Sequence, residues 1–182
     1  MKKNNLHALL VFVLVVLSGM GIAWAGSQNG ATAFGVPIFA LVVGLVFVIQ
    51  WLAFIPAYLR QSERFFDLTG SLTYITVIIL AVLLTGGYDG RALLLLLLVI
   101  VWAMRLGRFL FLRIRKAGKD GRFDAIKPSF LRFLNVWTLQ GLWVAFTLAA
   151  ALAAITTTTR QALGAIEMLG AVVWGIGFAI EV

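Results

Sequence analysis

Six apolar stretches of about 20 residues each follow one another along this chain. A helix of ~20 residues crosses the roughly 30 Å hydrocarbon core of a bilayer, and lipid cannot satisfy the backbone of an open, irregular structure. Hydrophobic residues make up 62% of the 182 residues and charged residues 12%, about half the charged fraction of a soluble domain. The sequence therefore predicts an all-α, polytopic membrane helical bundle. The expected spans are Leu6–Ala25, Phe34–Ile55, Leu68–Thr85, Ala92–Phe111, Phe133–Ile155 and Leu163–Val182.

The basic residues are distributed unevenly over the connections between these spans. Of the 15 Lys and Arg residues, 13 precede the first span, follow the second or surround the connection between the fourth and fifth, whereas Arg91 and Arg160 lie on the other side. The positive-inside rule places the richer side in the cytoplasm. We therefore predict six transmembrane helices with both termini and the connection 113–132 cytoplasmic, in one domain (1–182) of a bacterial inner (plasma) membrane. The same rule accounts for the net charge of +8, so no nucleic-acid partner is expected.

The first span has two interpretations. Residues Met1–Ala25 combine a basic start, the apolar run Leu9–Leu17 and the sequence Ala23-Trp24-Ala25 before Gly26, which is typical of a cleaved signal peptide. The stretch Leu6–Ala25 is also long enough to cross the bilayer by itself. We favour a retained helix, and cleavage leaves the orientation of the other five spans unchanged.

Five basic residues near the end of the fourth span fall within an arc of about 160° at 100° per residue. They are Arg105, Arg108, Arg113, Arg115 and Lys116. Their side chains either snorkel to an anionic inner leaflet or form an anion site for a phosphorylated cofactor or substrate. Arg105 lies about 20 Å into its span at 1.5 Å per residue, where an Arg that faces lipid is costly. We therefore predict that Arg105 faces the interior of the bundle.

Few other polar residues lie within the spans. Asn135 and Gln140 are typical of hydrogen bonds between helices, whereas Glu167 and Glu181 lie close to the two membrane surfaces. The chain has no Cys and one His, which excludes disulfides and thiolate chemistry and leaves no metal site to expect. Spacing alone therefore identifies no reaction.

Several segments together resemble a known family. The chain is similar to the DUF1295 family of membrane proteins, relatives of the steroid 5-alpha-reductase C-terminal domain, over roughly residues 60–182. The most specific part of the resemblance is Arg122–Trp143. The segments that carry it are Gly121–Ile126, Phe130–Phe133, Trp137–Val144, Phe66–Thr73 and Trp102–Gly107.

The resemblance implies a reductase that uses NADPH to reduce a carbon–carbon double bond conjugated to a carbonyl group, in a lipid-like or steroid-like substrate. The candidate cofactor-binding residues that it implies are Arg105, Arg122, Asp124, Gln140 and Glu181. The family's main cofactor segments follow the point at which this sequence stops, so we expect the front part of such an enzyme and only weak NADPH binding. The alternative is a noncatalytic membrane subunit or a lipid-binding or assembly module, with membrane lipids as its partners. A transporter is disfavoured because inverted repeats and matching broken helices are not visible.

Overall fold

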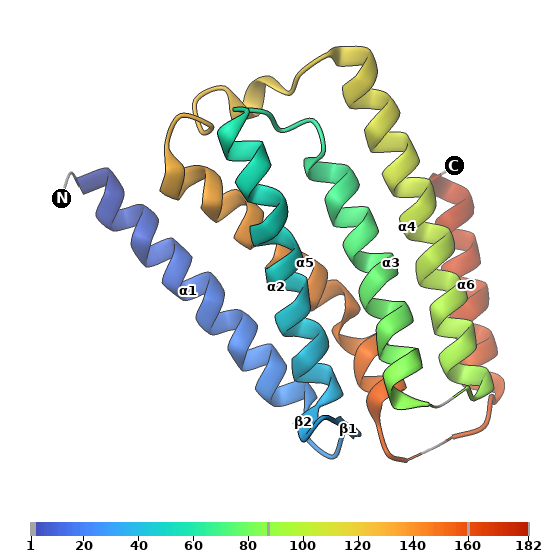
Figure 1. The fold of residues 1–182 in the computed structure, drawn as a ribbon. Helices are drawn as coiled ribbons and strands as arrows, with labels where there is room; N and C mark the ends of the chain where they lie inside the picture. Colours follow the sequence, from blue (N-terminus) through green and yellow to red (C-terminus); the bar gives the residue numbers. More distant parts are fainter. Residues whose placement is uncertain (1–2, 87, 160, 182) are drawn as a thin grey trace.

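The computed structural model describes residues 3–86, 88–159 and 161–181. Within these residues the chain forms a bundle of six α-helices, with one short hairpin and one 3₁₀ turn (Figure 1). The elements are α1 (Lys3–Gly26), β1 (Thr32–Ala33), β2 (Val36–Pro37), α2 (Ile38–Leu59), α3 (Phe66–Thr85), α4 (Gly90–Ala117), η1 (Gly121–Phe123), α5 (Phe130–Thr156) and α6 (Ala165–Glu181). Five of the described helices, α1 to α5, are long and apolar enough to cross a membrane. The predicted all-α membrane bundle is confirmed.

The start of the second predicted span is wrong by four residues. Phe34 and Gly35 have positive φ values of 55° and 76°, and they form the turn between β1 and β2. Pro37 then provides a fixed φ of −56° directly before α2, which begins at Ile38. The apolar run therefore extends past the helix into a hairpin, because Gly and Pro determine the local backbone there.

Helix α4 is longer than predicted at its basic end. It begins after Asp89, whose carboxylate accepts a hydrogen bond of 2.7 Å from the Ala92 N–H, and it continues six residues past Phe111 to Ala117. Gly118, with φ of 81°, ends it. The last turns are rich in Arg, a good helix former, so the helix continues where the apolar run stops. The non-helical part of the predicted cytoplasmic connection is correspondingly shorter, over 118–129 apart from η1.

Helices α2, α3 and α5 form the interior of the bundle. Val42 and Val46 of α2, Val77 of α3 and Leu152 of α5 are fully buried. Side-chain hydrogen bonds connect these helices inside the apolar core; for example, Gln50 Nε2 donates to Thr73 Oγ1 at 2.9 Å, and Trp51 Nε1 donates to Thr138 Oγ1 at 3.1 Å. Such bonds satisfy polar groups that lipid and apolar side chains cannot. Helix α1 packs along α5 and α2, and α6 lies at the edge of the bundle against α4 (Figure 1).

The connections alternate between the two ends of the bundle. Figure 1 shows the first turn of α1, the α2–α3 connection, the α4–α5 connection and the last turn of α6 at one end, with the hairpin and the other two connections at the opposite end. The connections that the charge pattern assigns to one side of the membrane thus lie at one end of the bundle. The assignment of the basic end to the cytoplasm remains a prediction.

Candidate functional site

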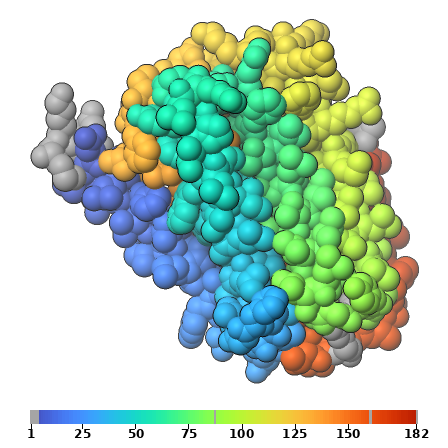
Figure 2. All heavy atoms as spheres, viewed as in Figure 1, coloured from blue at the N-terminus to red at the C-terminus, as the bar shows by residue number. Residues whose placement is uncertain are grey.

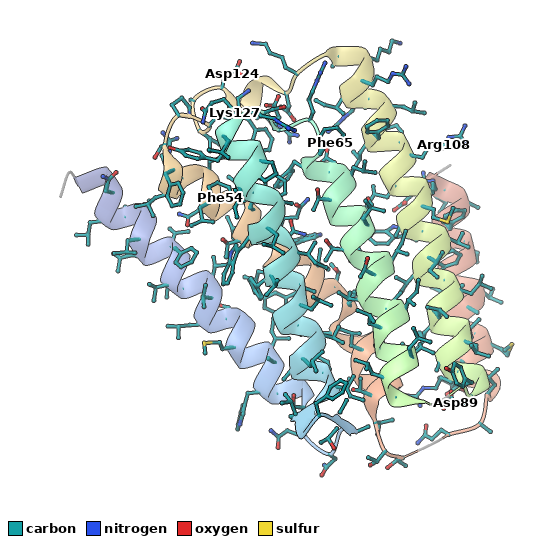
Figure 3. The ribbon with its side chains drawn as sticks, viewed as in Figure 1. Phe54, Phe65, Asp89, Arg108, Asp124 and Lys127 are labelled. Carbon is teal, nitrogen blue, oxygen red and sulfur yellow. The ribbon has the colours of Figure 1, made fainter. Side chains whose placement is uncertain are left out.

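A cluster of ion pairs fixes the α4–α5 connection onto the α2–α3 connection. Glu63, whose side chain is 3% exposed, accepts hydrogen bonds from Lys127 Nζ at 2.7 Å and from the Asp120 backbone N–H at 2.8 Å. Lys127 Nζ also lies 3.3 Å from Asp124 Oδ1, and Lys119 Nζ lies 2.8 Å from Asp124 Oδ2. Figure 3 shows Asp124 and Lys127 in the connection next to the end of α2. One buried carboxylate therefore holds two connections together.

The pKa values of this cluster follow from its hydrogen bonds. Burial acts to raise the pKa of Glu63, but the hydrogen bonds from Lys127 and from the Asp120 N–H outweigh it and lower the pKa below its ordinary value. The hydrogen bond to Glu63 in turn raises the pKa of Lys127. The hydrogen bond from Lys119 and the one from Lys127 lower the pKa of Asp124. All three groups are therefore charged at neutral pH.

Arg122 forms a forked ion pair with a neighbouring carboxylate. Its Nε lies 3.0 Å from Asp120 Oδ1, its Nη2 contacts Asp120 Oδ2, and its backbone N–H donates to Oδ1 at 3.0 Å. These hydrogen bonds raise the pKa of Arg122, and the Asp67 carboxylate at the start of α3 adds a smaller effect. The guanidinium is therefore engaged, although its side chain is 72% exposed. A phosphate that binds Arg122 has to compete with Asp120.

Arg105 and Glu181 meet at the contact between α4 and α6. Arg105 Nη1 lies 2.6 Å from Glu181 Oε2, and the Arg105 guanidinium lies over the Phe178 ring, 5.3 Å from its centroid. The Arg105 side chain is 26% exposed. Arg105 thus lies between two helices, where the ion pair offsets the cost of its charge. The sequence could not pair these residues, because they are 76 positions apart.

Gln140 occupies the contact between α5 and the start of α3. Its Nε2 donates to the backbone carbonyl of Phe66 at 3.1 Å, whereas its buried Oε1 has no hydrogen-bond partner among the described residues. The close approach requires Gly70, since a Cβ at that position would lie 2.6 Å from Gln140 Nε2. A buried acceptor without a donor is costly, so this group needs an explanation, of which a bound ligand or water is one.

A cavity of about 200 Å³ lies between α3, α4 and α5, and Gln140 is part of its wall. Its other polar lining residues, Asp67, Ser71 and Tyr74, come from α3. Its remaining lining residues are Gly70 of α3, Trp102, Leu106 and Leu110 of α4, and Trp143 and Val144 of α5. The cavity is therefore mainly apolar, with a polar wall along α3, which is typical of a small-molecule site.

The two ends of this cavity differ in chemistry. Arg113 of α4 approaches the Asp67 carboxylate, with Nη2 to Oδ2 at 3.5 Å, so the end near the connections is charged. Deeper in the bundle, the Tyr74 hydroxyl lies 2.6 Å from Thr147 Oγ1, and the Tyr74 ring packs edge-on against Trp102 with centroids 4.9 Å apart. The cavity thus runs from an end where the Asp67 carboxylate pairs with Arg113 to an interior lined by aromatic rings.

An aromatic cluster joins this cavity to the ion-paired connection. The Phe66 ring lies edge-on to Phe123 of η1 and to Trp137 of α5, with centroid distances of 5.2 and 5.1 Å. Phe133 is fully buried beside both partners. Figure 2 shows the α4–α5 connection as atoms that cover this end of the bundle. A movement of the connection would therefore act on Phe66, whose carbonyl holds Gln140.

The structure does not bring the five candidate cofactor residues together at one place. Arg105 and Glu181 form one pair, Arg122 and Asp124 belong to the connection, and Gln140 belongs to the cavity. Sequence reasoning did not identify Asp67 and Tyr74, which line the cavity with Gln140, as site residues, nor Thr147, the partner of Tyr74, nor the buried Glu63. The signal for Asp67 was a lone carboxylate in the first turn of a span, whereas nothing in the spacing distinguishes Glu63.

The apolar helices define an integral membrane protein built as an α-helical bundle, with a cavity between three of them. The sequence profile of the family described as "Protein of unknown function (DUF1295)" matches residues 53–182. This match covers more than half of the chain, so the protein belongs to the DUF1295 family, as its motifs predict. No curated protein and no solved structure matches the chain.

Proposed function

We propose that the protein binds a lipid-like or steroid-like enone in the cavity between α3, α4 and α5, as the substrate-binding part of an NADPH-dependent reductase in a bacterial inner membrane. The observation that carries the proposal is the buried Gln140 carboxamide, with its unpartnered Oε1, in the wall of a mainly apolar cavity. The reductase step itself is supported by the family resemblance to steroid 5-alpha-reductase relatives.

The size and lining of the cavity suit one end of a larger apolar molecule. A volume of about 200 Å³ equals that of roughly seven liquid water molecules, enough for a ring or a short chain segment. Trp102 and Leu106 provide apolar contact area, and the rest of a lipid-like ligand can extend between the helices into the bilayer.

Two polar groups can orient the ligand. The Thr147 hydroxyl is within hydrogen-bond distance of the Trp143 and Val144 carbonyls, so the Tyr74 hydroxyl can give its own proton either to Thr147 or to a ligand carbonyl. Gln140 Oε1 accepts a hydrogen bond from a ligand hydroxyl or a water. Tyr74 is therefore the group that we assign to polarise an enone carbonyl.

NADPH would supply hydride to such a substrate. Among the described residues, the five candidate cofactor ligands do not form one site, and the guanidinium groups of Arg105 and Arg122 are already paired with carboxylates. The alternative function is a lipid-binding module without catalysis.

The test is ligand binding to the detergent-purified protein, with tritiated 4-cholesten-3-one as the probe. Leu106→Trp fills the cavity, whereas Leu97→Trp places the same side chain on an exposed face of α4. We expect Leu106→Trp to weaken binding at least tenfold and Leu97→Trp to change it less than twofold. Equal binding by both variants, or none by the wild type, would contradict the proposal.

A parallel assay separates the two functions. NADPH oxidation that depends on the enone supports the reductase. Binding of the probe without NADPH oxidation supports the lipid-binding module.

A further inference from the structure

A second and larger cavity lies outside the proposed enone site, at the basic end of the bundle. It has a volume of about 630 Å³ and lies between the first turns of α1, the α4–α5 connection and the first turns of α5. Its polar lining residues are His7, Arg132 and Asn135, and its apolar ones include Val11 and Val136. Polar and apolar groups thus meet where α1 and α5 both begin.

Asn135 provides an unused acceptor at this cavity. It is 7% exposed, and its Nδ2 donates to the Ala8 carbonyl of α1 at 2.8 Å, which fixes the orientation of the carboxamide. Its Oδ1 is buried and has no hydrogen-bond partner among the described residues. Ala8 also lines the cavity. A bound molecule that donates a hydrogen bond to Oδ1 would satisfy this acceptor.

Arg132 provides a cation at the same cavity. It is exposed, and it forms no ion pair within the part of the chain that the structure describes. It lies two residues into α5, and His7 lies close to the start of α1, so both are at the depth where lipid headgroups meet water. An Arg fork matches phosphate oxygens, and a neighbouring imidazole adds a second donor.

The surroundings indicate a membrane lipid as the source of the phosphate. Leu6 and Leu10 of α1 are 50% and 53% exposed, so this face of α1 lies against acyl chains in a bilayer. Val11 and Val136 extend the apolar wall from that face into the cavity. A soluble phosphate ester gains nothing from apolar walls, whereas the glycerol backbone and upper acyl carbons of a phospholipid bury apolar surface against them.

We propose that the cavity between α1 and α5 binds a phospholipid whose headgroup carries a hydrogen-bond donor next to its phosphodiester, such as an ethanolamine or a glycerol headgroup. The phosphodiester contacts Arg132 and His7, and the headgroup N–H or O–H donates to Asn135 Oδ1. A choline headgroup has the same phosphodiester but no such donor, so it satisfies Arg132 and not Asn135. This site is independent of the proposed enone cavity.

The experiment is native mass spectrometry of the purified protein after incubation with equal amounts of phosphatidylethanolamine, phosphatidylglycerol and phosphatidylcholine. We expect the wild type to retain the first two at least fivefold more than phosphatidylcholine. Arg132→Gln should lower retention of all three at least fivefold, while Arg108→Gln, an equal charge change on the outer side of α4 (Figure 3), should not. Asn135→Leu should abolish the headgroup preference and leave phosphatidylcholine retention unchanged.

Three results would overturn the proposal. Equal retention of all three lipids by the wild type would show that no headgroup donor binds Asn135 Oδ1. Wild-type lipid retention by Arg132→Gln, an exposed substitution that we expect to affect folding little, would show that Arg132 does not contact the phosphate. Displacement of the lipids by soluble glycerol 3-phosphate at millimolar concentration assigns the site to a soluble phosphate ester instead.

Discussion

Neutralising Glu63 should release the α4–α5 connection from the bundle. Removing one partner of a fully buried ion pair costs about 3–5 kcal/mol. In Glu63→Gln, Lys127 is 14% exposed and keeps Asp124 at 3.3 Å, so we expect about 2–3 kcal/mol of the stability of the closed connection to be lost. The Gln side chain still offers an oxygen to the Asp120 N–H, so this figure describes the lost charge alone.

The assay is hydrogen exchange of the Asp120 amide, because the change is local and need not unfold the helices. A loss of about 2–3 kcal/mol corresponds to roughly 30- to 150-fold faster exchange when exchange reports the opening equilibrium. Asp124→Asn disturbs the exposed pair with Lys119 and the 3.3 Å contact with Lys127 but leaves the Glu63–Lys127 pair in place, so it serves as the control and should have a smaller effect. An Asp120 exchange rate within threefold of the wild type in Glu63→Gln would refute the reasoning.

The remaining predictions concern pH, packing, charge and topology. The α4–α5 connection should resist proteolysis at pH values above the ordinary pKa of Glu63 and lose this resistance as the pH falls through the lowered pKa of Glu63. The reason is that the Glu63 carboxylate stabilises the connection only while it is ionised. The rate of proteolysis within segment 118–129, measured against pH, tests this. Gly107→Val should cost about 1–3 kcal/mol in thermal unfolding, since even a Cβ there would lie 2.7 Å from the Ser71 Cβ, and an unchanged melting temperature would contradict the close contact of α3 and α4. Arg105→Lys should change the free energy of unfolding by less than about 1 kcal/mol, because its partner, the Glu181 carboxylate, is 56% exposed. A larger loss would show that the planar guanidinium group of Arg105 is needed. An impermeant thiol reagent applied outside intact cells should label a cysteine at Ala31 and not one at position 119, and the reverse would invert the topology.

The sequence was sufficient for the helices because a membrane span is a local property. Each apolar run must satisfy its backbone hydrogen bonds within its own helix, so length and hydropathy identify α1 to α5 without knowledge of their neighbours. The error at Phe34–Pro37 arose because the same hydrophobicity continues into a hairpin, where Gly35 and Pro37 decide the backbone.

The candidate site was less predictable because it depends on contacts between distant helices. Gln140 reaches α3 opposite Gly70, 70 positions earlier in the chain, where the lack of a side chain leaves room for the carboxamide. The sequence predicted that Gln140 forms a hydrogen bond between helices, and its bond to the Phe66 carbonyl confirms this. The partner of Arg105 and the role of Glu63 required knowledge of which helix ends and connections meet, and single-residue spacing does not contain that information.

In the proposed function, a lipid-like enone occupies the cavity between α3, α4 and α5. A steroid enone that carries a photoreactive diazirine, irradiated with the protein in lipid nanodiscs and mapped by peptide mass spectrometry, tests it most directly. We expect labelling within 66–74 of α3, 102–110 of α4 or 140–144 of α5, suppressed by excess 4-cholesten-3-one and by Leu106→Trp. Labelling confined to the lipid-facing surfaces of α1 or α6, or labelling that excess enone does not suppress, would contradict it.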